Sequence, residues 1–204
     1  MNMVKKNILF LILLFLLSSF IPAGQTSNAD LIKWVIVPGG SLRVEGSTNV
    51  NKFNCEIANY SRPDTITLYS NSRTKESFPL SGDLRLDVQS FDCHNPVMTG
   101  DLRKTLKAKE HPKLHIKFLT LTRLPEAQSH EPVKGLVDIR LAGVTKRFDV
   151  NYKFSREGQG LQLIGVRDIH FSDFDLTPPR KLGGMIQTDN KLKVEFRLRM
   201  KEID

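Results

Sequence analysis

The sequence is poor in the residues that build nucleophilic or metal centres. Its 204 residues include only two cysteines, Cys55 and Cys93, and no G-x-S-x-G segment that would present a catalytic serine. Of the five histidines, His111 and His115 are four residues apart, but Pro112 breaks the helix that would align them. We therefore predict no catalytic residue, no metal site and no cofactor, and we do not expect an enzyme.

The charged residues are not gathered into any cluster or run. The formal net charge is +8, but the basic residues alternate singly with apolar ones in segments such as KLHIKFLTLTR and KLKVEFRLRMK. A nucleic-acid groove would cluster them beside aromatic residues, so we expect no nucleic-acid partner. Asp173 and Asp175 flank Phe174 just before two prolines, where carboxylates more often form turns than serve as acid and base.

Long apolar runs are absent except for one near the N-terminus. It extends from Ile8 to Leu17, follows Lys5 and Lys6, and is succeeded by small and polar residues. A membrane-spanning helix needs about 20 apolar residues, so the run is too short to be an anchor. The pattern indicates a secretory signal peptide over residues 1–29, with cleavage after Ala23 or Ala29.

The remaining residues, 30–204, have the length of one domain. We expect this domain to be periplasmic or secreted, without stable membrane insertion once the signal is removed. Export would deliver both cysteines to an oxidising compartment. An even cysteine count in that setting indicates a disulfide between Cys55 and Cys93, and a pair of buried thiols is the alternative.

Alternation of apolar and polar residues dominates the domain and predicts half-buried strands. Turn residues separate them, for example at Pro79–Gly82, Ala142–Val144 and 157–160. About eight antiparallel strands with short links can close into a barrel, and a sandwich is the alternative. The strands are expected at residues 41–45, 64–70, 83–88, 113–118, 137–141, 148–154, 160–170 and 192–200.

One segment, Thr99–Lys109, is expected to be helical. Thr99 can cap its first turn, Asp101 suits its positive end, and Pro112 follows its end. A helix of about ten residues is not stable alone, so it must pack on the barrel. We expect it to act as a lid whose apolar contacts come from Met98, Leu102 and Leu106.

The inward face of the strands is almost wholly apolar. An eight-stranded barrel can fill its interior with side chains or keep a slot for one elongated ligand, and alternation does not distinguish these cases. A filled barrel would be a structural or adhesive domain without a ligand. A hollow one would bind an apolar molecule.

Several segments resemble the YceI-like family of exported lipid-binding proteins. They are SLRVEGSTNVNKF, FDCHNPVMTGDLRKTLKAKEHPKLHIKF, VKGLVDIRLAGVTKRFDV and HFSDFDLTPPRKLGGMIQTDNKLKVEF. The resemblance implies an all-β, extended eight-stranded antiparallel, lipocalin-like barrel with one short helix. The chain departs from the family where Gly39 and Gly40 replace an acidic residue and a histidine, and where Asp175 replaces a glycine.

The resemblance also implies a function. It suggests an exported protein that holds a polyisoprenoid, fatty-acyl or other long-chain lipid for transport, storage or scavenging. A homodimer is left open, and the bound lipid would be a ligand, not a cofactor. The inward face and the resemblance together predict a continuous apolar slot lined by Ile116, Phe118, Val137, Ile139, Val150, Phe154 and Phe196.

Overall fold

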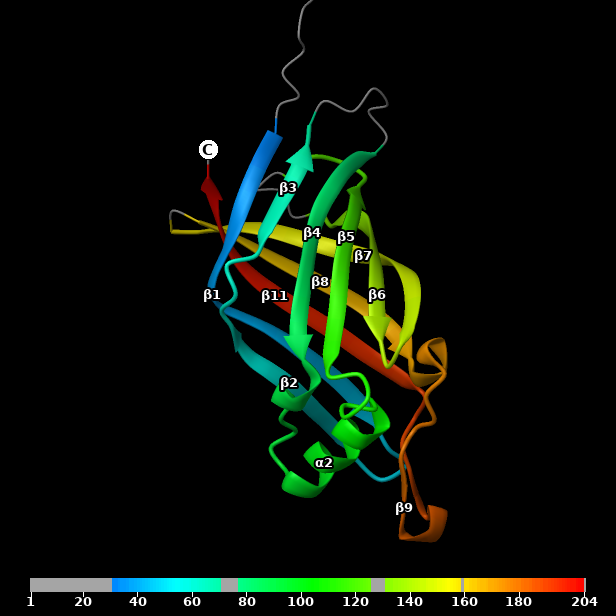
Figure 1. The fold of residues 1–204 in the computed structure, drawn as a ribbon. Helices are drawn as coiled ribbons and strands as arrows, with labels where there is room; N and C mark the ends of the chain where they lie inside the picture. The colour runs from blue at the N-terminus through cyan, green and yellow to red at the C-terminus, as the bar shows by residue number, and fades with distance from the viewer. Residues whose placement is uncertain (1–30, 71–76, 126–130, 159, 204) are drawn as a thin grey trace, which may run out of the picture.

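The computed structural model describes residues 31–70, 77–125, 131–158 and 160–203. The expected signal peptide, residues 1–29, lies outside this part of the chain. Eight strands form a closed antiparallel barrel in the order β1-β3-β4-β5-β6-β7-β8-β11, with β11 pairing back onto β1 (Figure 1). The predicted barrel is therefore confirmed.

Each of the eight barrel strands overlaps one of the eight predicted segments. The barrel strands are β1 (Leu31–Ser47), β3 (Thr65–Tyr69), β4 (Phe78–Asp87), β5 (Lys113–Leu121), β6 (Val133–Leu141), β7 (Val144–Glu157), β8 (Gly160–His170) and β11 (Lys191–Ile203). Outside the barrel lie β2 (Lys52–Tyr60), β9 (Arg180–Lys181) and β10 (Ile186–Gln187). The helical segments are α2 (Pro96–Thr105), η1 (Val88–Ser90), η2 (Phe171–Phe174) and η3 (Leu182–Gly184).

The strand β1 turns a corner at its two adjacent glycines. Gly39 has a φ angle of +104°, and the register between β1 and β11 shifts between Val37 and Ser41. A Cβ atom on Gly40 would lie 3.1 Å from the carbonyl oxygen of Arg197. These glycines bend β1, so its first half pairs with β3 and its second half with β2. The departure from the family pattern at this point therefore has a structural consequence.

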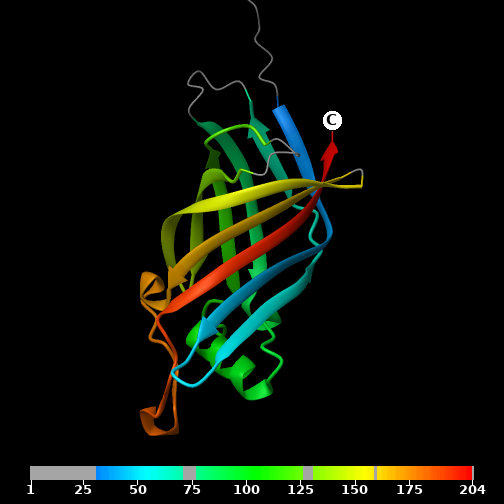
Figure 2. The ribbon, with the colours of Figure 1, turned by 180° about the vertical axis from the view of Figure 1, so that it is seen from behind.

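The strand β2 extends past the barrel beside β1, as Figure 2 shows from behind. Its other edge does not pair with β4. Instead, the backbones of Glu56 and Asp92 exchange hydrogen bonds of 2.8 and 2.9 Å. The predicted disulfide between Cys55 and Cys93 is confirmed beside this bridge. Together these contacts fasten β2 to the segment that leads into α2.

The helix α2 begins and ends earlier than the sequence indicated. The prediction that Thr99 caps it is wrong, because Asn95 is the N-cap and its side chain accepts hydrogen bonds from the backbone of Val97 and Met98. Pro96 takes the first helical position, where a missing N–H costs nothing. Thr99 lies inside the helix, and its hydroxyl accepts a 2.9 Å hydrogen bond from the backbone of Cys93.

The turn predicted at Pro79–Gly82 is also wrong. These residues lie within β4, and the register with β5 shifts between them. A bulge admits proline because it leaves a residue outside the ladder of hydrogen bonds. By contrast, Ala142 and Gly143 do form the expected tight turn between β6 and β7, with φ angles of +50° and +87°.

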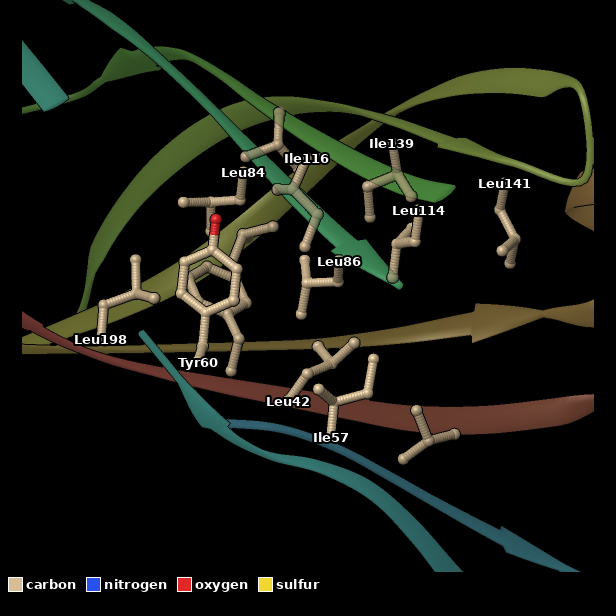
Figure 3. Close-up of a cluster of buried hydrophobic side chains, with 14 of the residues drawn as sticks. Leu42, Ile57, Tyr60, Leu84, Leu86, Leu114, Ile116, Ile139, Leu141 and Leu198 are labelled. Atoms are coloured by element: carbon tan, nitrogen blue, oxygen red, sulfur yellow. The ribbon is translucent and has the colours of Figure 1, made fainter. Parts of the chain in front are cut away.

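The barrel interior is packed with apolar side chains that converge from opposite walls. Figure 3 shows Leu42 and Ile57 on one wall facing Leu84, Leu86 and other aliphatic residues on the opposite wall. Among the described residues, Thr99 is the one buried residue with a polar side chain apart from the tyrosines Tyr60 and Tyr152. The core is therefore continuous from the barrel to the inner face of α2.

Candidate functional site

The half of the barrel next to α2 contains an apolar cavity of about 50 Å³. Its wall is built by side chains from five barrel strands, β1, β5, β6, β8 and β11, together with α2 and the segment before it. An apolar cavity offers water no hydrogen-bond partners, so it suits an apolar group. The lining residues are Leu42, Val44, Phe91, Leu102, Leu106, Leu114, Ile116, Ile139, Leu141, Ile169, Leu192 and Val194.

The other half of the barrel is filled by aromatic rings. Phe118 and Phe196 meet edge to face with centroids 6.0 Å apart, and Tyr152 contacts both rings at 6.3 and 6.0 Å. Gly165 makes room for this cluster, since a Cβ there would lie 2.3 Å from the ring of Phe196. Only a void of about 10 Å³ remains, roughly the space of one water-sized probe. None of the three rings lines the apolar cavity, but Phe118 and Phe196 each follow a cavity residue, Ile116 or Val194, by two positions on the same face of a strand; we call this aromatic cluster the floor.

A second hollow of about 300 Å³ lies outside the first, at the end of the barrel that carries α2. It is bounded by the β1–β2 turn, by α2 and by the β9–β10 hairpin, all at the lower end of the molecule in Figure 1. Phe53, Met98 and Ile186 contribute apolar surface, and Asp101 and Lys181 contribute charge. We call this hollow the mouth. Its volume lies at the lower limit of small-molecule sites.

One residue of α2 separates the mouth from the inner cavity. Leu102 lines both spaces, Met98 lines the mouth, and Leu106 lines the inner cavity. The three residues predicted for the lid thus form a stripe that runs from the outside to the inside, as i, i+4 spacing requires. Their role in controlling access stays a prediction.

The base of α2 is held firmly. The disulfide fixes Cys93 to β2, and the guanidinium of Arg103 donates a 2.8 Å hydrogen bond to the carbonyl of Phe91. The helix therefore does not lie on the barrel as a free flap. Leu102 is the residue that lines both spaces, so its side chain is where a test of access should begin.

The structure does not bring the seven predicted slot residues into one cavity. Ile116 and Ile139 line the inner cavity, whereas Phe118 and Phe154 line the small void beyond the floor. The other three, Val137, Val150 and Phe196, are buried but line none of these spaces. All seven lie on the inward face, and their role toward a ligand stays a prediction.

Sequence reasoning missed most of the cavity wall. Leu42, Val44, Leu141 and Leu192 show the same alternation as the residues that were chosen. Alternation identifies the inward face of a strand, but it does not give the height of a residue along the axis of a tilted barrel. The mouth was missed for another reason, because its walls are turns and short strands without periodicity.

Two tyrosines place hydroxyl groups in the barrel. Tyr60 donates to Asp64, and burial together with this hydrogen bond raises the pKa of Tyr60 well above its ordinary value. Burial alone raises the pKa of Tyr152. Among the described residues, the Tyr152 hydroxyl has no hydrogen-bond partner. Both phenols are therefore neutral at physiological pH.

The outer face carries paired charges. Arg147 donates two hydrogen bonds of 2.8 and 3.0 Å to Asp138, and this contact lowers the pKa of the Asp138 carboxyl. His115 faces outward, with Asp83 at 3.7 Å. In the described part of the chain, no three His, Cys, Asp or Glu side chains gather as a metal site would require. No helix within the same residues is long and apolar enough to span a bilayer.

Two solved structures have a fold similar to this one. The structure of BcnA from Burkholderia cenocepacia matches with a TM-score of 0.57 and 12% identity, over 78% of this chain and 95% of that one. A polyisoprenoid binding domain from Saccharophagus degradans, implicated in plant cell wall breakdown, matches with a TM-score of 0.54 and 13% identity, over 82% and 97%. At these identities the likeness shows the fold alone.

The sequence itself gives the family. A search of curated protein sequences found no significant match. The family model described as the YceI-like domain, however, matches residues 34–200 and so spans all eight barrel strands, α2 and the residues around the mouth. The chain therefore belongs to the YceI-like domain family.

Proposed function

We propose that this protein is a lipid-binding protein whose mouth and inner cavity hold a long apolar chain. The observation that carries the proposal is the pair of spaces that share Leu102 as a lining residue, of about 300 and 50 Å³. The relative from Saccharophagus degradans is a polyisoprenoid binding domain, which favours a polyisoprenoid or similar chain here. The protein would transport, store or scavenge this lipid and would catalyse no reaction.

The energetics of binding such a chain imply that its length is selected by the shape of the cavity and not by affinity. Each buried carbon contributes up to about 0.8 kcal/mol, so a few isoprene units reach useful affinity before the costs of binding are subtracted. Further isoprene units add little to the ability to distinguish one chain length from another by affinity. The aromatic floor of Phe118, Tyr152 and Phe196 would then decide how far a chain reaches.

We further propose that the protein acts outside the cytoplasm, in the periplasm or as a secreted protein. The charged start and short apolar run of the N-terminal segment support this, as does the disulfide between Cys55 and Cys93. An oxidising compartment is where such a bond persists.

The alternative is a filled domain without a ligand, and the packed aromatic cluster favours it for one half of the barrel. Displacement of a fluorescent fatty acid by unlabelled polyisoprenoid separates the two functions. Val194 lines the inner cavity, so Val194→Phe should fill it and weaken probe binding by at least about tenfold.

Val166 offers a matched control. It follows the buried Gly165 on β8 and lies on the opposite face of the sheet, where its partner on β11 is Glu195, and it is only partly buried. Val166→Phe makes the same change of volume outside the cavity and should leave probe binding unchanged. Absence of binding by the unaltered protein, or equal effects of the two substitutions, would contradict the lipid-binding function.

A further inference from the structure

Three separate segments form one braced rim around the mouth: residues 48–52, 95–101 and 180–187. The side chain of Asn49 donates a 2.8 Å hydrogen bond to the carbonyl of Met185 and accepts one of 3.0 Å from the backbone of Gln187. Across the mouth, Lys181 forms a 2.7 Å ion pair with Asp101. The turn, the hairpin and α2 therefore hold fixed positions relative to one another.

The rim carries the most exposed large hydrophobic side chains of the described residues. Val50, Val97, Leu182 and Met185 are 65, 68, 65 and 69% exposed, and every other such residue is below 50%. Scattered apolar residues are normal on a protein surface, but these four lie together on the three segments around one opening, two of them in its lining and two at the tip of the hairpin beside it. Such a surface marks a site of contact with an apolar partner.

The backbone of the hairpin adds a second observation. Leu182 has a φ angle of +50°, which is the left-handed region that side chains other than glycine rarely occupy. Gly183 and Gly184 follow with φ angles of +66° and +99° and complete the tight tip. The strained conformation presents the side chain of Leu182 to solvent, so burial of that side chain does not offset the cost of the strain. Strain kept without a packing benefit points to a functional constraint.

The charges of the rim indicate the chemistry of the partner. Its three segments contain Lys52, Arg180 and Lys181 against the single acidic residue Asp101. Since Asp101 pairs with Lys181, Lys52 and Arg180 remain as exposed positive charges beside the apolar tips. Apolar side chains flanked by basic ones match the interface of an anionic bilayer.

We propose that this rim docks the mouth of the barrel on the surface of an anionic lipid bilayer. Leu182, Met185, Val50 and Val97 enter the headgroup region, while Lys52 and Arg180 face the lipid phosphates. The contact is peripheral and reversible. Docking places the mouth where a water-insoluble chain can pass directly between bilayer and barrel, and this consequence rests on the proposed function.

Sedimentation with vesicles of phosphatidylcholine, with and without phosphatidylglycerol, tests the proposal. The protein expressed from the full sequence should bind vesicles that contain phosphatidylglycerol more strongly than vesicles of phosphatidylcholine alone. The double substitution Leu182→Ser/Met185→Ser should weaken binding by at least about tenfold, because two buried apolar side chains are lost. Val50→Ser/Val97→Ser is an independent pair on the other two segments and should act in the same direction.

Leu124→Ser/Ile203→Ser provides the matched control. These partly exposed residues lie just after the end of β5 and at the end of β11, and both strands end away from α2 (Figure 1). This double variant should bind vesicles like the unaltered protein, and it shares the same N-terminal segment. Failure of the unaltered protein to bind, or an equal loss in the control, would overturn the docking proposal. Rim-dependent dimers without vesicle binding would also overturn it, in favour of a second copy as partner.

The same preparations separate this proposal from the proposed function. Lipid extracted from the purified protein reports cargo, whereas sedimentation reports docking. Protein that carries lipid but does not bind vesicles keeps the proposed function and loses the docking proposal. Protein that binds vesicles through the rim but carries no lipid keeps the docking proposal and loses the proposed function.

Discussion

Tyr152 is the most unusual polar residue of the interior. Its side chain is 1% exposed, its ring lies against Gly135, and its hydroxyl has no partner among the described residues. A buried hydroxyl without a hydrogen bond costs roughly 1 to 3 kcal/mol. A tyrosine kept at such a cost is either tolerated for the shape of its ring or used by a group that arrives with a ligand.

Tyr152→Phe tests whether the hydroxyl is unpaired within the fold. In protein stripped of lipid, the substitution should leave the free energy of unfolding unchanged or raise it by up to about 2 kcal/mol, because an unpaired polar group is removed. Urea unfolding followed by circular dichroism gives this value. A loss of stability in the stripped protein would mean that the hydroxyl has a partner within the fold.

Phe118 tests the packing of the floor. Its ring is 1% exposed and contacts both Tyr152 and Phe196. Phe118→Ala should therefore cost about 3 to 5 kcal/mol of unfolding free energy, as in a close-packed core. The sequence alone had suggested a residue beside an open slot, for which the cost would be small. A cost below about 1 kcal/mol in urea unfolding would mean that this half of the barrel is loosely packed.

At the scale of single elements, we predict that α2 controls the path between the mouth and the inner cavity. Its base is fixed by the disulfide, so the side chain of Leu102 is the simplest gate. Leu102→Ala should join the two spaces and speed the release of a bound fluorescent fatty acid several-fold, as measured by stopped-flow displacement. Far-ultraviolet circular dichroism should keep the β-sheet signal.

Leu141→Ala is the matched control for the gate. Leu141 lines the inner cavity but not the mouth, so the same truncation enlarges the cavity without opening the path. Release from this variant should stay close to that of the unaltered protein. Equal acceleration by both substitutions would show that cavity size, and not Leu102, sets the rate.

The elements also show what a single sequence can and cannot predict. Strict alternation predicted six of the eight barrel strands, because a half-buried strand must alternate, and the weaker segments 64–70 and 160–170 supplied the other two. It did not predict β2 as an extension beyond the barrel, since this depends on the corner at Gly39 and Gly40. The start of α2 was misplaced because Asn95 and Pro96 are as good an N-terminal signal as Thr99. Local capping preferences do not rank such alternatives.

At the scale of the whole molecule, the barrel is neither filled nor hollow throughout. One half is closed by the aromatic cluster, and the other holds an apolar cavity that continues past Leu102 into the mouth. The sequence predicted an apolar interior but not which half is filled and which half holds a cavity, because that depends on the positions of the aromatic rings along the barrel axis. Gly135 and Gly165 create this division, since each lets an aromatic ring from a neighbouring strand lie over it.

The division also makes the two ends of the molecule different. The cavity, the gate, the mouth and the exposed apolar rim lie at one end, in that order from inside to outside. The closed aromatic half and the two chain ends of the barrel lie toward the other end (Figure 1). A ligand of one long chain fits such an arrangement because it needs a single opening.

The occupancy of the barrel tests the central claim most directly. Native mass spectrometry of protein purified from its own host, followed by organic extraction of the same sample, measures it. The account predicts one long-chain apolar lipid per barrel and a lower bound fraction in Val194→Phe, which fills the inner cavity. Protein that carries the mass of the polypeptide alone, and takes up no polyisoprenoid or fatty acid when these are supplied, would contradict it.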